Sequence, residues 1–182
     1  IQHGARIAGS AVTVLSHPGD NAMLHAAVEQ CRPGDVLVVA NTAPSTHGMF
    51  GDLLATSLLQ RGVRGLVIDA GVRDTADLRD MGFPVWTQHV SCQGTVKNTP
   101  GSVNVPIRLG EQMVNPGDVV CADDDGVVIV ARSEAAWALD QSNARLAKES
   151  ETRARLEAGE LGLDFYGLRE KLAAMGVEWV ES

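Results

Sequence analysis

The chain has 182 residues, a length that fits one domain with a sizeable core. Hydrophobic residues make up 45% of it and aromatic residues only 4%, which predicts a packed globule with a core of Val, Leu, Ile and Ala. The formal net charge of -8 argues against nucleic acid as a partner, because phosphate binding needs a basic face. A small anionic substrate remains compatible with this charge, because a local pocket can be positive on an acidic protein.

The cysteines, Cys31, Cys92 and Cys121, are far apart in the sequence and odd in number, which argues against a disulfide framework or a cysteine zinc site. We therefore expect a cytoplasmic protein. No apolar run approaches the roughly 18–20 residues that a membrane span needs, so no membrane partner is expected. The sequence begins with Ile1 rather than Met, and we expect further residues to precede it.

The first half of the chain alternates strand and helix patterns. Short apolar runs predict strands, the last three of them apolar enough for burial on both faces, at residues 6–15, 36–40, 65–70 and 84–90. Helical patterns occupy residues 20–31, with Asp20 as N-cap, and residues 51–61 and 75–81. This alternation predicts a partly parallel α/β layer with right-handed crossovers.

The second half changes character. Residues 102–109, 119–122 and 127–131 are predicted strands joined by short turns, and the segments 32–35 and 115–118 share a Pro-Gly-Asp turn that precedes a buried strand. A long polar helix is expected from about 133 to 157, with Ser133 as N-cap, and a shorter helix from about 165 to 175. No linker divides the chain, so we expect one domain over residues 1–182.

Two loops carry residue types suited to chemistry, namely residues 51–54 (GDLL) and residues 73–74 (RD). Each follows an apolar strand and opens a helix, and ligands in open α/β sheets bind beyond the carboxyl ends of strands. The amides of Leu53 and Leu54 at a helix start suit a carboxylate, Arg73 adds a permanent cation, and Asp74 adds a hard oxygen ligand.

Structural roles for the same residues remain open. Asp52 is at a position where an Asp commonly serves as a helix N-cap. Arg73 and Asp74 could form a surface ion pair, which usually contributes only about 0–1 kcal/mol. The combination of an acid, an Arg-Asp pair and two helix starts at the same sheet edge strengthens the case for a site, but from these residues alone both interpretations stay open.

The GDLL segment, followed after twenty residues by Arg73-Asp74 and Asp77, resembles the signature of the RraA-like family. The surrounding segments RGVRGLVIDAGVRDTADLRDMGFPVW, SCQGTVKNTPGSVNVP and VNPGDVVCADDDGVVIV resemble that family as well. The resemblance is strongest to its aldolase branch, the aldolases for 4-hydroxy-4-methyl-2-oxoglutarate and 4-carboxy-4-hydroxy-2-oxoadipate in aromatic compound catabolism. It implies an α/β chain with a compact single-domain β/β/α fold, swivelling-domain-like, with C-terminal helices. It also implies a homotrimer or a hexamer built as a dimer of trimers, with active sites between subunits.

The resemblance assigns roles to individual residues of this sequence. It implies that Gly51, Asp52, Leu53 and Leu54 form the turn whose amides bind the pyruvyl carboxylate of the substrate. Arg73 holds the substrate and stabilises enolate charge, Asp74 is the direct metal ligand, and Asp52 orders a water in the metal shell. Glu149 reaches the metal shell of a neighbouring subunit. The spacing of Arg145, Glu149 and Arg153 explains Glu149 almost as well, as part of a solvated, salt-bridged helix face.

The reaction that the resemblance implies is a class II, metal-dependent aldol cleavage of a small 2-oxo acid that releases pyruvate, with oxaloacetate decarboxylation as a second activity. Because no soft ligand cluster is present, the expected cofactor is Mg²⁺ or Mn²⁺. Two other functions remain open. The same family contains regulators that inhibit a ribonuclease, and a 2-oxo acid-binding module without turnover would keep the same motif.

Overall fold

The structure is a computed structural model that describes residue 1 and residues 3–179. Contacts within the chain group it into two units, Ile1–Ala135 and Ala136–Ser182, which are described separately below. One domain over residues 1–182 stays a prediction. No helix among the described residues is both long enough and apolar enough to cross a membrane.

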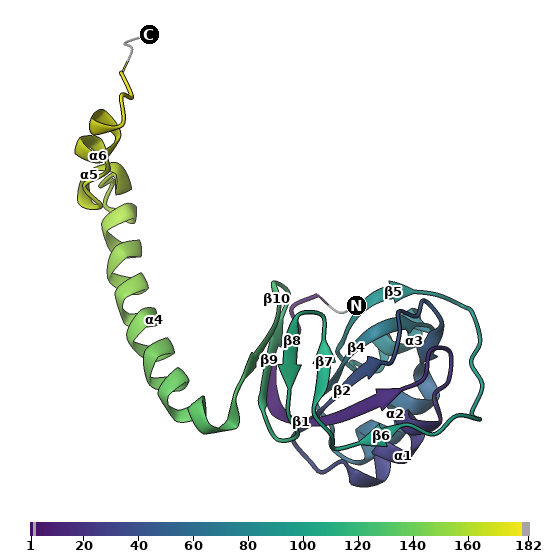
Figure 1. Ribbon diagram of the computed structural model, residues 1–182. Helices are drawn as coiled ribbons and strands as arrows, with labels where there is room; N and C mark the ends of the chain where they lie inside the picture. The colour runs from purple at the N-terminus through teal and green to yellow at the C-terminus, as the bar shows by residue number, and fades with distance from the viewer. Residues whose placement is uncertain (2, 180–182) are drawn as a thin grey trace. The chain divides into compact units, whose positions relative to one another are not determined.

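The first unit contains a mixed sheet, a separate two-stranded hairpin and three short helices (Figure 1). Its strands are β1 (Ile7–Ser16), β2 (Asp35–Asn41), β3 (Gly48–Phe50), β4 (Gly65–Val72), β5 (Val85–Val90), β6 (Ser102–Val103), β7 (Ile107–Leu109), β8 (Gln112–Val114), β9 (Val119–Asp123) and β10 (Gly126–Val130). Its helices are α1 (Ala22–Gln30), α2 (Asp52–Gln60) and α3 (Thr75–Asp80).

Parallel pairing dominates the centre of the sheet. β2 pairs in parallel with β1 and β4, and β4 also pairs in parallel with β3 and β5. β9 pairs antiparallel to both β1 and β10, which extends the sheet on the side away from β4. The carboxyl ends of the parallel strands therefore share one edge, where ligands bind in folds of this kind.

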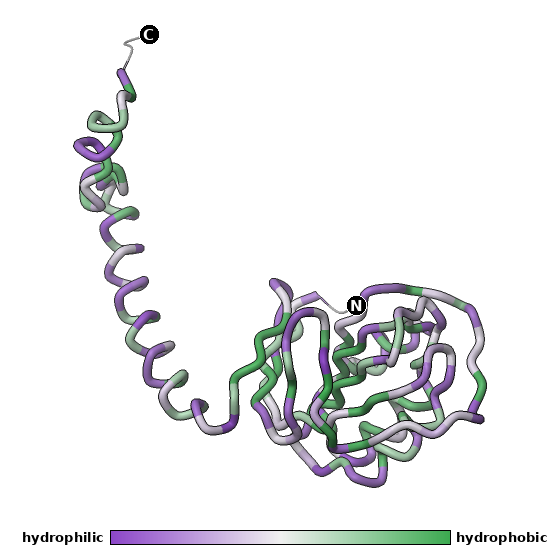
Figure 2. Tube along the Cα trace, viewed as in Figure 1, coloured by the Kyte–Doolittle hydropathy of each residue, from purple (hydrophilic) through white to green (hydrophobic). Residues whose placement is uncertain are grey.

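Two separate hydrophobic cores lie on the two faces of the sheet. On one face, α1, α2 and α3 bury Leu24, Leu58 and Leu78 against the strands. On the other face, the β7–β8 hairpin buries Ile107 and Val114. Each fully buried side chain of this size stabilises the fold by about 1.5–3 kcal/mol. Figure 2 shows the hydrophobic residues gathered on the strands between these layers. The predicted β/β/α arrangement is confirmed.

The second unit is helical. It consists of α4 (Ala135–Glu157), α5 (Gly162–Phe165) and α6 (Leu168–Ala174). No residue of α4 is buried, and Figure 2 shows this helix as largely hydrophilic. The prediction that helices follow the sheet toward the C-terminus is therefore confirmed.

The two Pro-Gly-Asp turns have the same hydrogen bonds. Asp35 Oδ2 accepts from the Arg32 amide at 2.8 Å, and Asp118 Oδ2 accepts from the Asn115 amide at 2.8 Å. The glycine before each Asp has a positive φ, 95° and 85° respectively, a conformation that glycine adopts without a Cβ clash. The predicted recurring turn is therefore confirmed at both positions.

Asp20 does not act as the expected N-cap but connects two distant segments through its carboxylate, an arrangement that we call the Asp20 clamp. The N-cap position of α1 is Asn21, and Asp20 instead accepts hydrogen bonds from the amides of Ala22, Asn98 and Thr99 at 2.9, 2.7 and 2.7 Å. Its side chain thereby joins the start of α1 to a loop far along the chain. Burial acts to raise the pKa of the Asp20 carboxyl, but these backbone hydrogen bonds outweigh it and hold the pKa below its usual value.

Three other predictions were wrong for local reasons, and two short strands were missed. The strand expected over residues 102–109 is divided into β6 and β7, with Asn104 at a φ of 57° between them. Ser133 lies inside a 3-10 turn, Arg132–Glu134, rather than capping α4. The helix expected over residues 165–175 is divided at Gly167, which has a φ of 63°. The short strands β3 and β8 were not predicted, because three residues are too few to establish a period.

The Asp20 clamp predicts a specific acid sensitivity. Because its pKa is lower in the folded chain than in the unfolded chain, its contribution to stability is complete above the unfolded pKa and is lost as pH falls through the folded pKa. We expect Asp20→Asn to lower the thermal unfolding midpoint at neutral pH and to reduce the change of that midpoint between pH 6 and pH 3. Thermal unfolding across this range measures both effects, and an unchanged midpoint at neutral pH would contradict the clamp.

Candidate functional site

The two loops singled out in the sequence meet at the carboxyl edge of the sheet. β3 leads through Gly51 into α2, and β4 leads through Arg73 and Asp74 into α3. The two strands pair in parallel, and the Arg73 amide donates to the Phe50 carbonyl at 2.8 Å. The predicted juxtaposition of the GDLL segment and the Arg-Asp pair is therefore present in the structure.

The Asp74 carboxylate is the centre of this contact. Its Oδ2 accepts hydrogen bonds from Arg73 Nε and from the Asp52 amide, both at 3.3 Å. Asp74 occupies the N-cap position of α3, yet its side chain makes no capping hydrogen bond. Its backbone is left-handed, with φ 54° and ψ 40°, a region that Asp visits at some cost and that directs the side chain away from the helix start. The carboxylate is thus held toward Arg73 and α2 instead of capping its own helix.

Gly51 makes room for that carboxylate. A Cβ atom on Gly51 would lie 2.1 Å from Asp74 Oδ2 and 3.1 Å from Arg73 Cγ. Gly51 is the N-cap residue of α2 and has an extended backbone, so the need for glycine here is steric and not conformational. This also corrects the structural alternative for Asp52, which is the first residue of α2 and not its cap.

Groups that could bind an anion lie at the same edge. The first amides of a helix have no partner within the helix, and in the described part of the chain the amides of Leu53 and Leu54 have none elsewhere. The Leu54 side chain anchors the turn in the core, whereas the Leu53 side chain is 73% exposed. Because Arg73 contacts Asp74 through Nε, its two terminal nitrogens remain able to grip a carboxylate. The Asp52 amide, in contrast, is already engaged with Asp74.

The donor set fits a divalent cation held by few protein ligands. The Asp74 side chain is 32% exposed and offers hard carboxylate oxygens. Among the described residues no group of three or more His, Cys, Asp or Glu side chains could hold a metal. Mg²⁺ is commonly bound through one or two carboxylates with water and substrate oxygens completing its shell, so Asp74 suits such a site.

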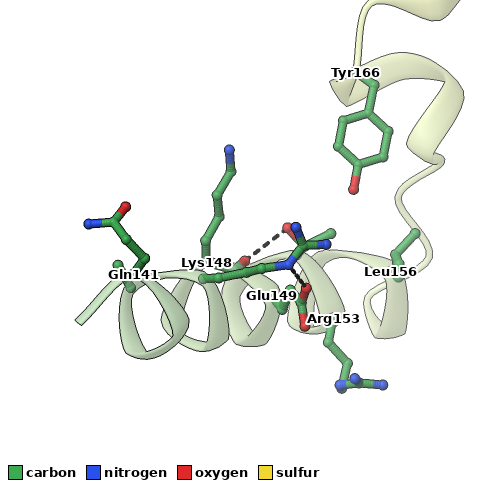
Figure 3. Close-up of a pocket in the computed structure, with 9 residues that line it drawn as sticks. Gln141, Lys148, Glu149, Arg153, Leu156 and Tyr166 are labelled. Carbon is green, nitrogen blue, oxygen red and sulfur yellow. Dashed lines mark hydrogen bonds and ion pairs between the residues drawn. The ribbon is translucent and has the colours of Figure 1, made fainter. Parts of the chain in front are cut away.

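Glu149 lies in the second unit, on α4, and accepts a hydrogen bond from Arg145 Nε at 2.7 Å. Glu149 and Tyr166 both line an open groove of about 820 Å³. Figure 3 shows these two side chains. The i, i+4 ion pair matches the salt-bridged helix face that the sequence left open. A role of Glu149 at a neighbouring subunit stays a prediction.

Two features beside Arg73 were not predicted from the sequence. The Ser91 amide, just after β5, donates to the Val72 carbonyl at 2.9 Å, and the Gly48 amide donates to the Gln93 carbonyl at 2.9 Å. The segment 91–93 therefore runs beside the residue that precedes Arg73. Its sequence, Ser-Cys-Gln, has no pattern that would indicate this position.

Gly51→Ala tests whether the space that Gly51 leaves for the Asp74 carboxylate matters for cation binding. The new methyl group would force the Asp74 carboxylate away from the Asp52 amide and Arg73, so we expect Mn²⁺ affinity, measured by calorimetry, to fall roughly 10–100-fold. Gly94→Ala is the matched control, because a Cβ there meets nothing within 4 Å. Equal Mn²⁺ affinity in both variants would show that the Asp74 position is irrelevant to the cation.

Comparisons with known proteins agree with this fold. The model of the RraA-like family, described as Aldolase/RraA, matches residues 1–129. A protein of Halalkalibacterium halodurans, provisionally named 4-hydroxy-4-methyl-2-oxoglutarate aldolase, is 29% identical over 150 residues, which cover 82% of this chain and 71% of that protein. A protein of Shewanella oneidensis with the same provisional name is 34% identical over 125 residues, which cover 69% of this chain and 76% of that protein.

A solved structure extends the likeness to a differently named protein. The crystal structure of Streptomyces coelicolor RraAS2, titled an unusual member of the RNase ES inhibitor RraA protein family, is 32% identical to this chain. It superposes with a TM-score of 0.77 over 85% of this chain and 81% of its own. The family match, the relatives and the shared fold lead to one conclusion: this chain belongs to the RraA-like family.

Proposed function

We propose that this chain is a divalent-metal-dependent lyase that cleaves 4-hydroxy-4-methyl-2-oxoglutarate or 4-carboxy-4-hydroxy-2-oxoadipate to pyruvate and a second 2-oxo acid. The observation that carries the proposal is the Asp74 carboxylate, which is withheld from capping α3 and is shared by Arg73 and the Asp52 amide. The two provisionally named aldolases among the relatives support the same reaction class.

Substrate binding follows from the groups at this edge. The amides of Leu53 and Leu54 and the terminal nitrogens of Arg73 offer donors to the pyruvyl carboxylate and the C2 carbonyl. Mg²⁺ or Mn²⁺ held by Asp74 would supply Lewis-acid stabilisation of the negative charge that develops on the C2 oxygen. Arg73 adds a fixed positive charge to the same oxygen, and because this charge is preorganised it favours the transition state over the bound substrate.

The proposed cleavage balances without an external reductant or oxidant. A water molecule ordered by Asp52 accepts the proton of the C4 hydroxyl, C4 becomes a carbonyl carbon, and the C3–C4 bond breaks. The electron pair of that bond passes to C3 and yields the enolate of pyruvate, which is protonated at C3. The second product is pyruvate from the first substrate or oxaloacetate from the second. Oxaloacetate loses CO₂ through the same enolate, so decarboxylation is the proposed second activity.

The proposed assembly is a homotrimer or a dimer of trimers in the cytoplasm, with Glu149 reaching the site of a neighbouring subunit. Both the chain and the substrate are negatively charged, so substrate binding is expected to need the local positive charge of Arg73 and a cation.

Pyruvate release tests the reaction directly. With either substrate or oxaloacetate, we expect pyruvate release when Mg²⁺ is present, loss of release in EDTA and recovery when Mg²⁺ is restored. A coupled lactate dehydrogenase assay measures the pyruvate. We expect Arg73→Ala and Asp74→Ala each to lower kcat/KM by roughly 10²–10³-fold, because each removes charge stabilisation from the transition state. Asp80→Asn, an exposed acid at the end of α3, serves as the control. Wild-type rates in either site variant would exclude this mechanism.

A second candidate function comes from the similarity to the RraA structure. It predicts inhibition of a ribonuclease by direct binding, with no need for a metal. A folded chain that releases no pyruvate from any of the three substrates, yet inhibits an RNase E-type enzyme in EDTA, would establish this function in place of the lyase.

Glu149 has a matched control on its own helix. We expect Glu149→Ala to lower kcat/KM for pyruvate release while Glu151→Ala leaves it unchanged, because only Glu149 is assigned to a neighbouring site. Loss of the exposed Arg145 ion pair alone should have little effect on the thermal unfolding midpoint. Equal activity of the two variants would remove Glu149 from the site.

A further inference from the structure

The base of the Arg73 side chain lies close to Gly48 of β3. The segment 91–93, which we call the strap, lies against the same glycine, because a Cβ there would also meet the carbonyl oxygens of Ser91 and Gln93. Hydrogen bonds hold the strap at both ends. The Ser91 amide donates to the Val72 carbonyl, and the Gln93 carbonyl accepts from the Gly48 amide. Gln93 also donates its amide to Ser91 Oγ at 3.2 Å, which tightens the strap.

Glycine is the only residue that fits at position 48 without movement of a neighbour. A Cβ on Gly48 would lie 2.3 Å from the Ser91 carbonyl oxygen and 3.3 Å from Arg73 Cβ. The first distance is far inside van der Waals contact, so the strap or the strand would have to move. The second distance places any new side chain directly against the stem of Arg73. Gly48 has no positive φ, so its backbone conformation alone does not require glycine.

Gly71, paired with Gly48 in the sheet, provides a comparison. A Cβ on Gly71 would lie 2.5 Å from the Thr46 carbonyl oxygen and 2.7 Å from the His47 carbonyl oxygen. The steric conflict is similar in size, but the three atoms nearest to that Cβ include none of Arg73. The chain thus offers two neighbouring glycines with comparable backbone clashes, and only one of them has Arg73 among its closest neighbours.

The position of the Arg73 stem sets the direction of its guanidinium. Nε must reach Asp74 Oδ2 at 3.3 Å while the terminal nitrogens stay available for an anion. A small displacement at Cβ is amplified along the side chain, and a misplacement of about 1 Å at a reacting group can cost roughly 10²-fold in rate.

We propose that Gly48 is a positioning residue for Arg73. By leaving room beside the strap and the Arg73 stem, it aims the guanidinium at both Asp74 and the substrate. This inference rests on the proposed function for its catalytic consequence, whereas its geometric part, the restraint of Arg73, can be measured without turnover.

The experiment compares Gly48→Ala, Gly71→Ala and Gly94→Ala with the wild type in the full chain. Two readouts are used: kcat and KM for pyruvate release with Mg²⁺, and the rate of modification of Arg73 by phenylglyoxal, followed by peptide mass spectrometry. We expect Gly48→Ala to raise KM about tenfold or more, to lower kcat and to speed modification of Arg73. Gly71→Ala should lower the unfolding midpoint without either effect on Arg73, and Gly94→Ala should change nothing.

A double-mutant cycle separates positioning from general damage. In an Arg73→Ala background, Gly48→Ala should have no further effect on kcat/KM, because the residue through which it acts is gone. If Gly48→Ala does not fold, Ser91→Ala loosens the strap without a clash and should speed Arg73 modification to a smaller extent. Additive effects in the cycle, or equal Arg73 modification in the Gly48 and Gly71 variants, would overturn the proposal. If the wild type releases no pyruvate while Arg73 modification still changes only in Gly48→Ala, the proposed function fails and the positioning role stands.

Discussion

Burial of β2 and β4 on both faces is the constraint on which the rest of the structure depends. Apolar side chains alternate to both sides of these strands, so each face needs its own cover. The helices provide one cover and the β7–β8 hairpin provides the other. Because the central strands run parallel, every crossover returns to the same end of the sheet, and the following loops collect at the opposite edge. The site is thus a consequence of how the core is covered.

The strongest apolar runs were predicted correctly from the sequence. The runs at residues 36–40 and 65–70 became β2 and β4, because a strand buried on both faces leaves an unbroken hydrophobic pattern. The elements that were missed or misplaced depend on other forces. Asp20 was expected to cap a helix, but its Oδ2 accepts from amides almost eighty residues away, which no local pattern reveals. Gly167 was read as helix interior, yet its left-handed backbone divides the segment.

The sequence predicted which residues of the candidate site lie near one another, but it did not predict the contacts among them. Strand order and the position of loops after strands place Asp52, Arg73 and Asp74 at one edge. The sequence could not show that the Asp52 amide is already used by Asp74, which reduces the free amides to those of Leu53 and Leu54. Nor could it show why residues 48 and 51 are glycines, because each makes room for an atom from a distant segment. Steric exclusion between segments leaves no local periodicity in a sequence.

The left-handed backbone of Asp74 limits what evolution can place at this position. Apart from glycine, Asn and Asp are the side chains that tolerate a φ of 54° best, and β-branched or bulky residues are strongly disfavoured. A lineage without the cation site proposed for Asp74 would therefore be expected to replace this Asp with Asn or Gly, which preserve the turn into α3 while removing the charge. If Asp74 has the proposed role, the identity of one residue at a strained turn separates members of this fold that keep the acid from members that keep only the shape of the turn.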